Sequence, residues 1–589
     1  MNKRIQILSI LFLGVSQIAF SQIKEEKLIL NKKREPEVKK IEKKKTSVET
    51  IKNYPPEEKS QNPVQYRITD VPAVSDFKTS TIQGEDVAPK FDATAQNNYV
   101  QFGMGNFGKI LADANVSKTL QNKLEVGADF HFLSTLGLKK EYDWDSKQSA
   151  TSIGAFLNSY GDKGKFNLNA EYNLDNNNYY GIYALEPAAD VDLKQRVNQF
   201  KVNGYYDFYS NEILNDVRVK SSFLKDHFDA QENQASILVN LSKHAVAVGK
   251  SGINLNADLG VGLEAVKTDF EIRDKNSSNF FNATLDPKLT FAKGESYLMI
   301  GSSFAFLNAK NSNLLMAEQM KNNKTYWFPK AEFQVAAAKE FKFYGGVDGG
   351  LKLNTYADML QVNPFVLSDQ MLKPTETKYH FYVGLRGDID ENIKYDVSAG
   401  YGKMKDILFY KANGLFDSQF TLNRSAYNFA NTFSAVYDDG NVSDIKGSIQ
   451  YFPLANLVLD GEVRFTKYDL KNYDNIYNIP LLNASIGAKY TMLDKKLTLG
   501  FKGIFASDRT TNSYSIEGVA NPAMMYQSTE NTDDKVGGYA DLNLSAEYKF
   551  HKNFSIFAVG NNLLNSNYQT YKGYKVLGAQ ILGGVKITF

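Results

Sequence analysis

The chain has 589 residues, and its 68 lysine and arginine residues nearly balance its 66 aspartate and glutamate residues. This balance provides no basic surface of the kind that nucleic acids need, so no nucleic-acid partner is expected. The chain has no cysteine, which excludes disulfides and cysteine-based metal or redox chemistry. After the first twenty residues no apolar run approaches the roughly 18 residues of a spanning helix, which excludes a helical membrane protein.

Residues 1–21 have the pattern of a secretory signal peptide. A charged start at Lys3 and Arg4 leads into a mostly apolar run, and that run ends in small residues that suit cleavage before Gln22. The alternative is a retained transmembrane helix, but the run is short and no stop-transfer pattern follows it. We therefore expect an exported protein.

Residues 22–96 form a segment whose composition differs from that of the rest of the chain. Its first half is rich in lysine and glutamate, and its second half carries five prolines. Such a composition buries too little apolar surface for a core of its own, so we expect an irregular periplasmic arm. Two interpretations remain open: a solvated tether, or a docking arm (residues 23–90) that orders on a periplasmic protein partner or inside the following domain. The most apolar stretch of the arm, 66–74, is where ordered contacts are expected.

From residue 97 to Phe589, apolar and polar residues alternate in segment after segment. In 166–174 five positions of one kind interleave with four of the other, 542–550 repeats the pattern, and 253–259 follows it over a shorter length. A period of two is typical of a strand with one polar face. One such strand fits a soluble propeller or sandwich equally well. Roughly twenty of them, with no helical pattern between, favour an all-β fold: a transmembrane antiparallel barrel with apolar residues toward lipid and polar residues in the lumen. The 35 tyrosines and 39 phenylalanines suit the aromatic girdles of such barrels.

The connections between these strands predict their number and the polarity of the barrel. Short turns are expected at 161–164, 388–392 and 493–496, and longer connectors at 308–324, 356–375 and 507–534. Outer-membrane barrels have short periplasmic turns and longer extracellular loops. We predict about 22 strands, with roughly 20 or 24 as alternatives, because a hairpin at 99–120 can count as two full spans or fewer.

The last strand ends the chain on an aromatic residue. Ile581, Val585, Ile587 and Phe589 share one face of an extended strand, and polar residues occupy the other face. A barrel closes by pairing its last strand with its first. We expect the barrel-assembly machinery to read the strand that ends in Phe589, and outer-membrane lipid to surround the finished barrel.

Several stretches resemble the barrel of TonB-dependent receptors of the Bacteroidota type. They are 554–565 with the following Tyr568 and Tyr571, the last strand 577–589, and the mid-chain motif made of 363–365, 372–376 and 382–387. The resemblance covers 97–589 as architecture, and its recognisable motifs lie in the second half. It implies an integral protein of the Gram-negative outer membrane that passes or binds a solute.

One departure from that family concerns the N-terminal plug, a domain of well over a hundred residues that fills the lumen and couples to an inner-membrane energy source. The segment 22–96 is too short and too polar for such a domain, and Glu49-Thr50-Ile51 matches the family's coupling box in only three common residues. The chain therefore looks like a plugless relative. It can be a diffusive pore, a barrel closed by its own arm or loops, or a structural subunit.

No catalytic, metal or cofactor site is expected, and ligand-binding residues remain unknown at this stage. The five histidines have no familiar zinc spacing, and no Gly-x-Ser-x-Gly elbow is present, so the protein is not expected to be an enzyme. The histidines are His131, His227, His244, His380 and His551. The charged residues expected to face the lumen carry both signs, so no ion selectivity is inferred. They are Glu171, Asp258, Asp460, Glu462, Arg464 and Glu547.

Two short motifs are interpreted as turns. The run 103–108 matches Gly-x-Gly-x-x-Gly, but strand-like alternation follows it instead of the helix that a dinucleotide site needs, so a hairpin turn is expected. The run 438–441 resembles part of a calcium loop. Its twelfth position is Ile449 where the liganding glutamate should stand, so Asp439-Gly440 is interpreted as a hairpin signal.

Two functional hypotheses follow. The first is an outer-membrane barrel of the TonB-dependent-receptor type that passes or binds a solute. The second is a non-transporting structural or assembly subunit that recruits a periplasmic partner through residues 23–90. They differ in whether the lumen conducts or binds a solute.

Overall fold

The computed structural model describes residues 98–120, 123–138, 144–182, 191–209, 211–272, 276–313, 318–416, 425–521 and 524–589. The signal peptide, the arm, its stretch 66–74, Glu49-Thr50-Ile51 and the absence of a plug concern residues outside these ranges, and they stay predictions. Within the described ranges, no helix is long and apolar enough to cross a membrane.

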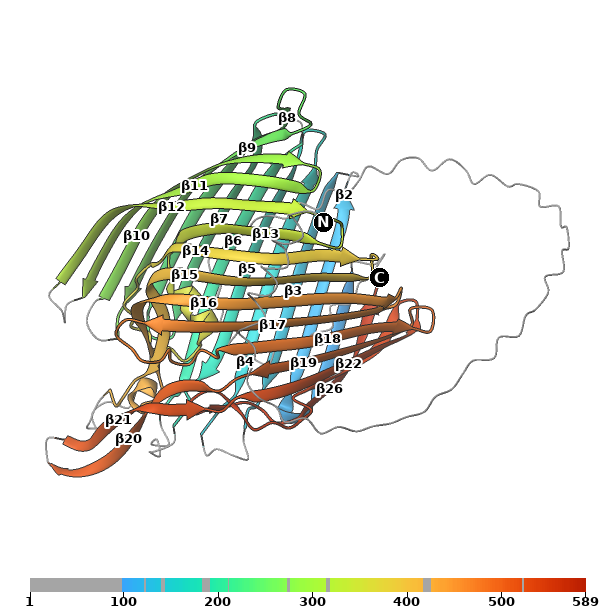
Figure 1. Cartoon of the computed structure of the whole chain (residues 1–589). Coiled ribbons are helices and arrows are strands. Elements are labelled where there is room, and N and C mark those ends of the chain that lie inside the picture. The colour runs from blue at the N-terminus through green and yellow to red at the C-terminus, as the bar shows by residue number, and fades with distance from the viewer. Residues whose placement is uncertain are drawn as a thin grey trace, which may run out of the picture. The chain divides into compact units, whose positions relative to one another are not determined.

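Twenty-two strands of the described part form one closed antiparallel barrel (Figure 1). Its first eleven strands are β1 (Tyr99–Gly105), β2 (Ile110–Leu120), β3 (Leu124–Thr135), β4 (Gln148–Tyr160), β5 (Gly164–Asn178), β6 (Lys194–Phe208), β7 (Leu214–Asp226), β8 (Gln231–Ala247), β9 (Asn254–Phe270), β10 (Asn276–Lys293) and β11 (Ser296–Asn313). The others are β12 (Glu318–Ala336), β13 (Lys342–Lys352), β14 (Thr375–Ile389), β15 (Ile393–Ala412), β16 (Phe433–Leu454), β17 (Leu457–Leu470), β18 (Leu482–Met492), β19 (Leu497–Ala506), β22 (Tyr539–His551), β23 (Phe554–Asn561) and β26 (Gln580–Thr588).

The barrel closes because β1 pairs with β2 on one side and with β26 on the other. Tyr99 lies opposite Thr588, and Gly105 lies opposite Leu582. Glycine is required at this seam, since a Cβ on Gly584 would stand 2.1 Å from the carbonyl oxygen of Phe102. The predicted fold class and strand number are confirmed, and the hairpin 99–120 counts as two strands.

The outer surface of the wall carries large apolar side chains. On β26, Ile581 is 62% exposed and Val585 is 52% exposed, and on β5 Leu168 is 41% exposed. On β5 the intervening residues are polar, as the period of two predicted. An exception lies near the seam, where Leu582 of β26 is buried in a small apolar cluster with Leu111, Phe557 and Val559.

Short turns lie at the end of the barrel where β26 ends, and long connections lie at the other end. The predicted turns 161–164, 388–392 and 493–496 join β4 to β5, β14 to β15 and β18 to β19, so these three predictions are confirmed. The run 103–108 is also a hairpin turn, as predicted. Its middle is a single 3-10 turn, η2 (Asn106–Gly108), in which Gly108 has a φ of +60°.

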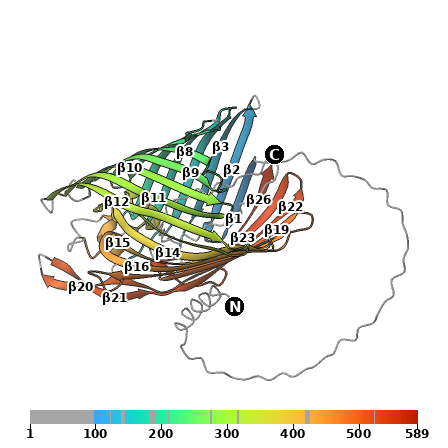
Figure 2. The ribbon, with the colours of Figure 1, turned by 45° about the horizontal axis from the view of Figure 1, so that its top comes forward.

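One of the three predicted long connectors, 308–324, was wrong, whereas 507–534 is confirmed as part of the connection between β19 and β22. Most of 308–324 is strand, because β11 and β12 continue pairing up to Asn313 opposite Glu318. The connector 507–534 forms a separate hairpin of β20 (Arg509–Asn521) and β21 (Met524–Val536), which projects from the long-connection end (Figure 2).

The predicted hairpin at 438–441 was also wrong. These residues lie inside β16, where the pairing with β15 shifts register between Met404 and Ile407. The buried carboxylate of Asp438 accepts backbone N–H groups from Asn472 (2.7 Å) and Tyr473 (3.1 Å). The Asp-Gly signal therefore marks a β-bulge that anchors the β17–β18 connection instead of a chain reversal.

Candidate functional site

The connection between β13 and β14, residues 353–374, turns into the barrel, and we name it the inner loop. It contains the helix α2 (Tyr356–Val362), which begins at Thr355 because that side chain accepts the backbone N–H of Asp358 at 3.1 Å. The inner loop contacts β7, β8, β11 and β16, strands spread around the wall. It therefore crosses the lumen at the long-connection end. The predicted connector 356–375 is confirmed as a connector.

Two buried carboxylates hold the start of the inner loop against β7 and β8. Glu232 accepts the backbone N–H groups of Tyr356 (2.6 Å) and Ala357 (2.9 Å). Asp226 accepts the Tyr356 hydroxyl at 2.7 Å and the Ser368 hydroxyl at 2.5 Å. Burial raises the pKa of the Tyr356 phenol well above its usual range, so this group stays protonated and donates. The anchoring therefore depends on four hydrogen bonds that converge on these two buried carboxyl groups.

Three other connections pack on the inner loop through aromatic side chains. Phe365 stacks on Tyr574 with centroids 3.5 Å apart, and Tyr180 meets Tyr574 edge-on at 4.9 Å. The Tyr179 hydroxyl donates to the carbonyl oxygen of Val366 at 3.0 Å. We use the name cap for the inner loop together with residues 179–182, 426–433 and 568–577, which share this buried cluster.

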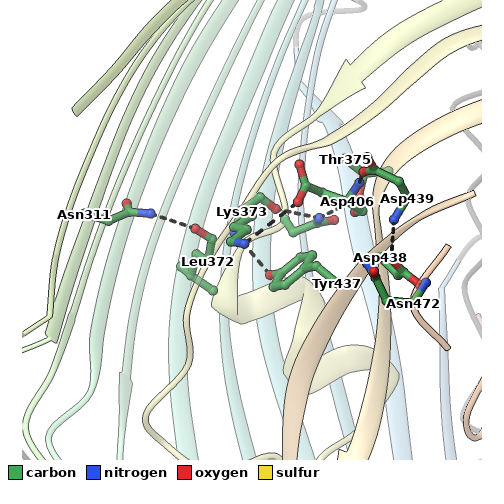
Figure 3. Close-up of polar contacts among 10 residues, drawn as sticks. Asn311, Leu372, Lys373, Thr375, Asp406, Tyr437, Asp438, Asp439 and Asn472 are labelled. Atoms are coloured by element: carbon green, nitrogen blue, oxygen red, sulfur yellow. Dashed lines mark hydrogen bonds and ion pairs between the residues drawn. The ribbon is translucent and has the colours of Figure 1, made fainter. Parts of the chain in front are cut away.

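The motif 372–376, which the resemblance singled out, fixes the return of the inner loop to the wall (Figure 3). The backbone N–H of Lys373 donates to the Tyr437 hydroxyl at 3.2 Å, and its ammonium lies 3.9 Å from the Asp406 carboxylate. Asn354 donates to the carbonyl oxygen of Lys373 at 2.8 Å, and the Thr375 hydroxyl donates to that of Asp406 at 2.7 Å. The motif therefore has a structural role at the hinge between the inner loop and β14.

A cavity of about 1610 Å³ lies in the lumen, and we name it the chamber. Cap residues such as Val362, Phe365 and Tyr571 form one end of it, and its walls come from strands on both sides of the barrel. Polar side chains dominate the inner faces of these strands, so the chamber suits a hydrated or polar solute.

The charged residues that the sequence placed in the lumen have different positions. Glu462 and Arg464 line the chamber. Glu171 lies 3.8 Å from the Lys201 ammonium, Asp258 lies 2.9 Å from His244, and Glu547 is buried and accepts the Ser555 hydroxyl at 2.5 Å. Asp460 is exposed and lies outside the residues that line the chamber.

Three of the five histidines lie beside carboxylates of the barrel: His244, already described, His131 and His380. His131 lines the chamber, 3.9 Å from the Asp113 carboxylate. His380 of β14 lies between Asp444 of β16 (2.6 Å) and Asp348 of β13 (3.7 Å), an arrangement that spacing in the sequence does not reveal. Among the described residues, no group of three histidine, aspartate or glutamate side chains is arranged to hold a metal ion.

One corner of the chamber holds residues that the sequence gave no reason to single out. Arg509, Tyr539 and Asn478 line it and are each more than nine-tenths buried. The burial of Arg509 lowers the pKa of its guanidinium, which nevertheless remains charged at physiological pH. Only the folded chain brings these residues together, because they come from three different connections or strand ends.

Comparison with solved structures finds barrels of the same fold. The chain is similar to the closed form of the ferric-catecholate import receptor Fiu from E. coli K12, with a TM-score of 0.60 and 11% identity over 84% of this chain and 82% of that one. It is similar to the siderophore receptor PiuA from Acinetobacter baumannii (TM-score 0.58, 10% identity, 84% and 82% covered). It is also similar to the copper transporter OprC (TM-score 0.57, 12% identity, 84% and 80% covered).

No family model and no curated protein sequence matches the chain. At 10–12% identity the likeness to solved structures shows the fold alone. The fold defines the class: a closed 22-strand barrel of the architecture that the resemblance to TonB-dependent receptors implied. These neighbours are named as receptors and a transporter, and none is named as an enzyme.

Proposed function

We propose that this protein is an outer-membrane barrel that binds a polar solute in the chamber and passes it when the cap moves. The chamber beneath the cap is the observation that carries this proposal. Its volume is about 1610 Å³, which is large enough to hold a solute much larger than a simple ion. The apolar outer face fits lipid, and the long connections, including the cap, would face the cell exterior.

The likeness to import receptors and a transporter supports this proposal at the level of the class. A solute that enters from the exterior must pass the inner loop, which crosses the lumen. The buried anchors Glu232 and Asp226 make that loop a stable barrier, so passage requires breaking identifiable hydrogen bonds. We infer that the cap is the gate and that the wall is the fixed frame.

Single-channel conductance in planar bilayers tests the proposal. The samples are the full mature chain, a chain that starts near Ala95, and a full mature chain in which a short glycine-serine linker replaces residues 357–371. We expect low conductance from the first two and large, steady conductance from the third. Silence in all three would contradict the gate. Large conductance only after removal of the arm would place the gate in the arm.

As a second candidate function, we propose that the chain is a subunit of an outer-membrane complex that recruits a partner. The firmly anchored cap favours it, because a permanently closed barrel would transport nothing. Residues 23–90 would dock a periplasmic protein, and the strand ending in Phe589 would be read by the assembly machinery. Affinity purification with and without residues 23–90 tests the docking arm. Recovery of the same partners with both chains would contradict it.

A further inference from the structure

We propose that the corner of the chamber around Arg509 is a subsite for an anionic group of the solute: a carboxylate, sulfate or phosphate. This inference rests on the proposed solute-binding chamber and narrows its substrate class to anionic solutes. We define the anion corner as Arg509, Tyr539 and Asn478.

The first argument is an unbalanced buried charge. Arg509 is 7% exposed and lies at the start of β20. Its Nη2 donates to the carbonyl oxygen of Gln569 at 2.6 Å, and its Nη1 donates to that of Thr570. None of the described carboxylates forms an ion pair with it. Carbonyl dipoles orient the guanidinium but leave its net charge uncompensated, and buried charges are normally paired.

The second argument is that the nearby carboxylate is already engaged. Asp541 accepts the Tyr568 hydroxyl at 2.9 Å and the backbone N–H of Asn562 at 3.2 Å. Asp534, on the hairpin that begins with Arg509, pairs with Lys572 at 2.8 Å. Asp534 therefore already has a cation of its own, and Asp541 points its oxygens at neutral donors instead of forming an ion pair with Arg509.

The third argument is a pair of polar atoms without partners on residues of this corner. The Nε of Arg509 and the hydroxyl of Tyr539 are buried and have no hydrogen-bond partner, and both residues line the chamber. Both are donors, as an anion requires. The Tyr539 ring is fixed by stacking on Tyr568 at 4.1 Å, so its hydroxyl has a defined position.

Asn478 completes the corner and links it to Arg509 through the backbone. Its N–H donates to the carbonyl oxygen of Thr510 at 2.7 Å, and its Nδ2 donates to that of Tyr410 at 2.8 Å. Its Oδ1 has no partner. Asn478 therefore adds an unpartnered acceptor to a corner whose other two residues supply donors, which suits a solute that carries a hydroxyl as well as the anionic group, as in a uronic acid.

The wall next to the corner adds positive charge. Arg464, Asn483, Ala506 and Tyr539 lie in one row across four neighbouring strands. At about 4.8 Å per strand, the row places Arg464 within roughly 15 Å of Tyr539. Three cations of the wall strands β16–β19 and β22 line the chamber against two carboxylates, so the net positive charge of this side would draw an anion. The cations are Lys446, Arg464 and Lys502, and the carboxylates are Glu462 and Asp541.

The test is titration calorimetry of the full mature chain in detergent, at fixed ionic strength, with sulfate, inorganic phosphate and glucuronate as probes. Glucose is the neutral match for glucuronate, and chloride is the background anion. We expect saturable binding of the three divalent or carboxylate anions and no binding of glucose.

Two substitutions locate the site. Tyr539→Phe removes only the unpartnered hydroxyl and should weaken anion binding about tenfold, the effect of one hydrogen bond to a charged group. Arg509→Lys keeps the charge, loses the planar fork and should weaken it further. The matched control is Tyr410→Phe, since the Tyr410 hydroxyl is also buried and unpartnered but lies outside the chamber lining. This control should bind anions like the parent chain.

Three outcomes would overturn the subsite: no saturable anion binding, anion binding equally strong in Tyr539→Phe and the parent chain, or glucose binding as tight as glucuronate binding. The gate is read separately from the conductance of the chain with residues 357–371 replaced. If that variant conducts and the parent chain binds no anion, the subsite alone is rejected. If that variant does not conduct and the parent chain binds anions, the transport proposal is rejected and the subsite is kept.

Discussion

The wall and the cap of this barrel are stabilised in different ways. The wall is built from neighbouring strands whose side chains alternate outward and inward, so the sequence of each strand specifies which of its side chains face outward. The cap is built from four connections that lie far apart in the sequence and meet in the folded barrel, as where the hydroxyl of Tyr179 donates to the carbonyl oxygen of Val366. The comparison suggests that the wall can persist while the cap opens, which is what a gate needs.

The largest expected effect of a single substitution lies in the aromatic centre of the cap. Phe365→Ala removes the stack on Tyr574 and leaves a cavity in the buried cluster. We expect a loss of about 3–5 kcal/mol from the stability of the cap. Hydrogen exchange of the α2 amides would measure it, and the amides of β5 should keep their protection. Equal loss of protection in the wall would show that the two regions unfold together.

The next effect concerns the outer face of the wall. Leu168→Arg puts a charge on the exposed apolar face of β5 and should cost about 2–4 kcal/mol near the middle of the bilayer. The inward neighbour provides the control, since Asn169→Arg should cost little. Folding equilibria in lipid vesicles would compare the two. Equal costs would contradict the assignment of the outer face to lipid.

A smaller effect is expected at the anchor of the inner loop. Glu232→Gln keeps the shape but weakens the acceptor of the N–H groups of Tyr356 and Ala357. We expect a cost of about 1–3 kcal/mol to the cap and more frequent opening events in single-channel records. Glu462→Gln makes the same change at a carboxylate of β17 that lines the chamber away from the anchor, and it is the matched control. Its opening frequency should stay near that of the parent chain.

The smallest effect is expected at the hinge of Figure 3. Lys373→Gln removes an ion pair with Asp406 that spans 3.9 Å and is partly exposed. Such pairs contribute about 0–1 kcal/mol, and the backbone N–H of residue 373 still donates to Tyr437. The opening frequency should change less than in Glu232→Gln. A larger change would mean that the ammonium itself controls the gate.

The sequence predicted the wall better than the cap for a physical reason. Alternation is local, so 166–174 and 542–550 could be assigned to strands without knowing their neighbours. The inner loop depends on contacts between residues far apart, such as Glu232 with Tyr356, and no local pattern reveals them. The motif 372–376 could be found in the sequence, but its role at the hinge required the positions of Asp406 and Tyr437. The anion corner was missed because Arg509 and Asn478 lie in polar segments that resemble ordinary loops.

The central claim is that the cap closes the chamber at the long-connection end. The chain has no cysteine, so one introduced cysteine is the only thiol that can be labelled, and its labelling rate reports the accessibility of that position. We would place it at Ser236, which lines the chamber, and label intact cells with a membrane-impermeant maleimide on a bulky polymer. Ser515→Cys, on the projecting hairpin, serves as the accessible control.

The account predicts slow labelling at position 236, rapid labelling at position 515, and acceleration at position 236 when Phe365→Ala is added. Rapid labelling at position 236 in the chain with an intact cap would show that the chamber is open to the exterior and would contradict the account.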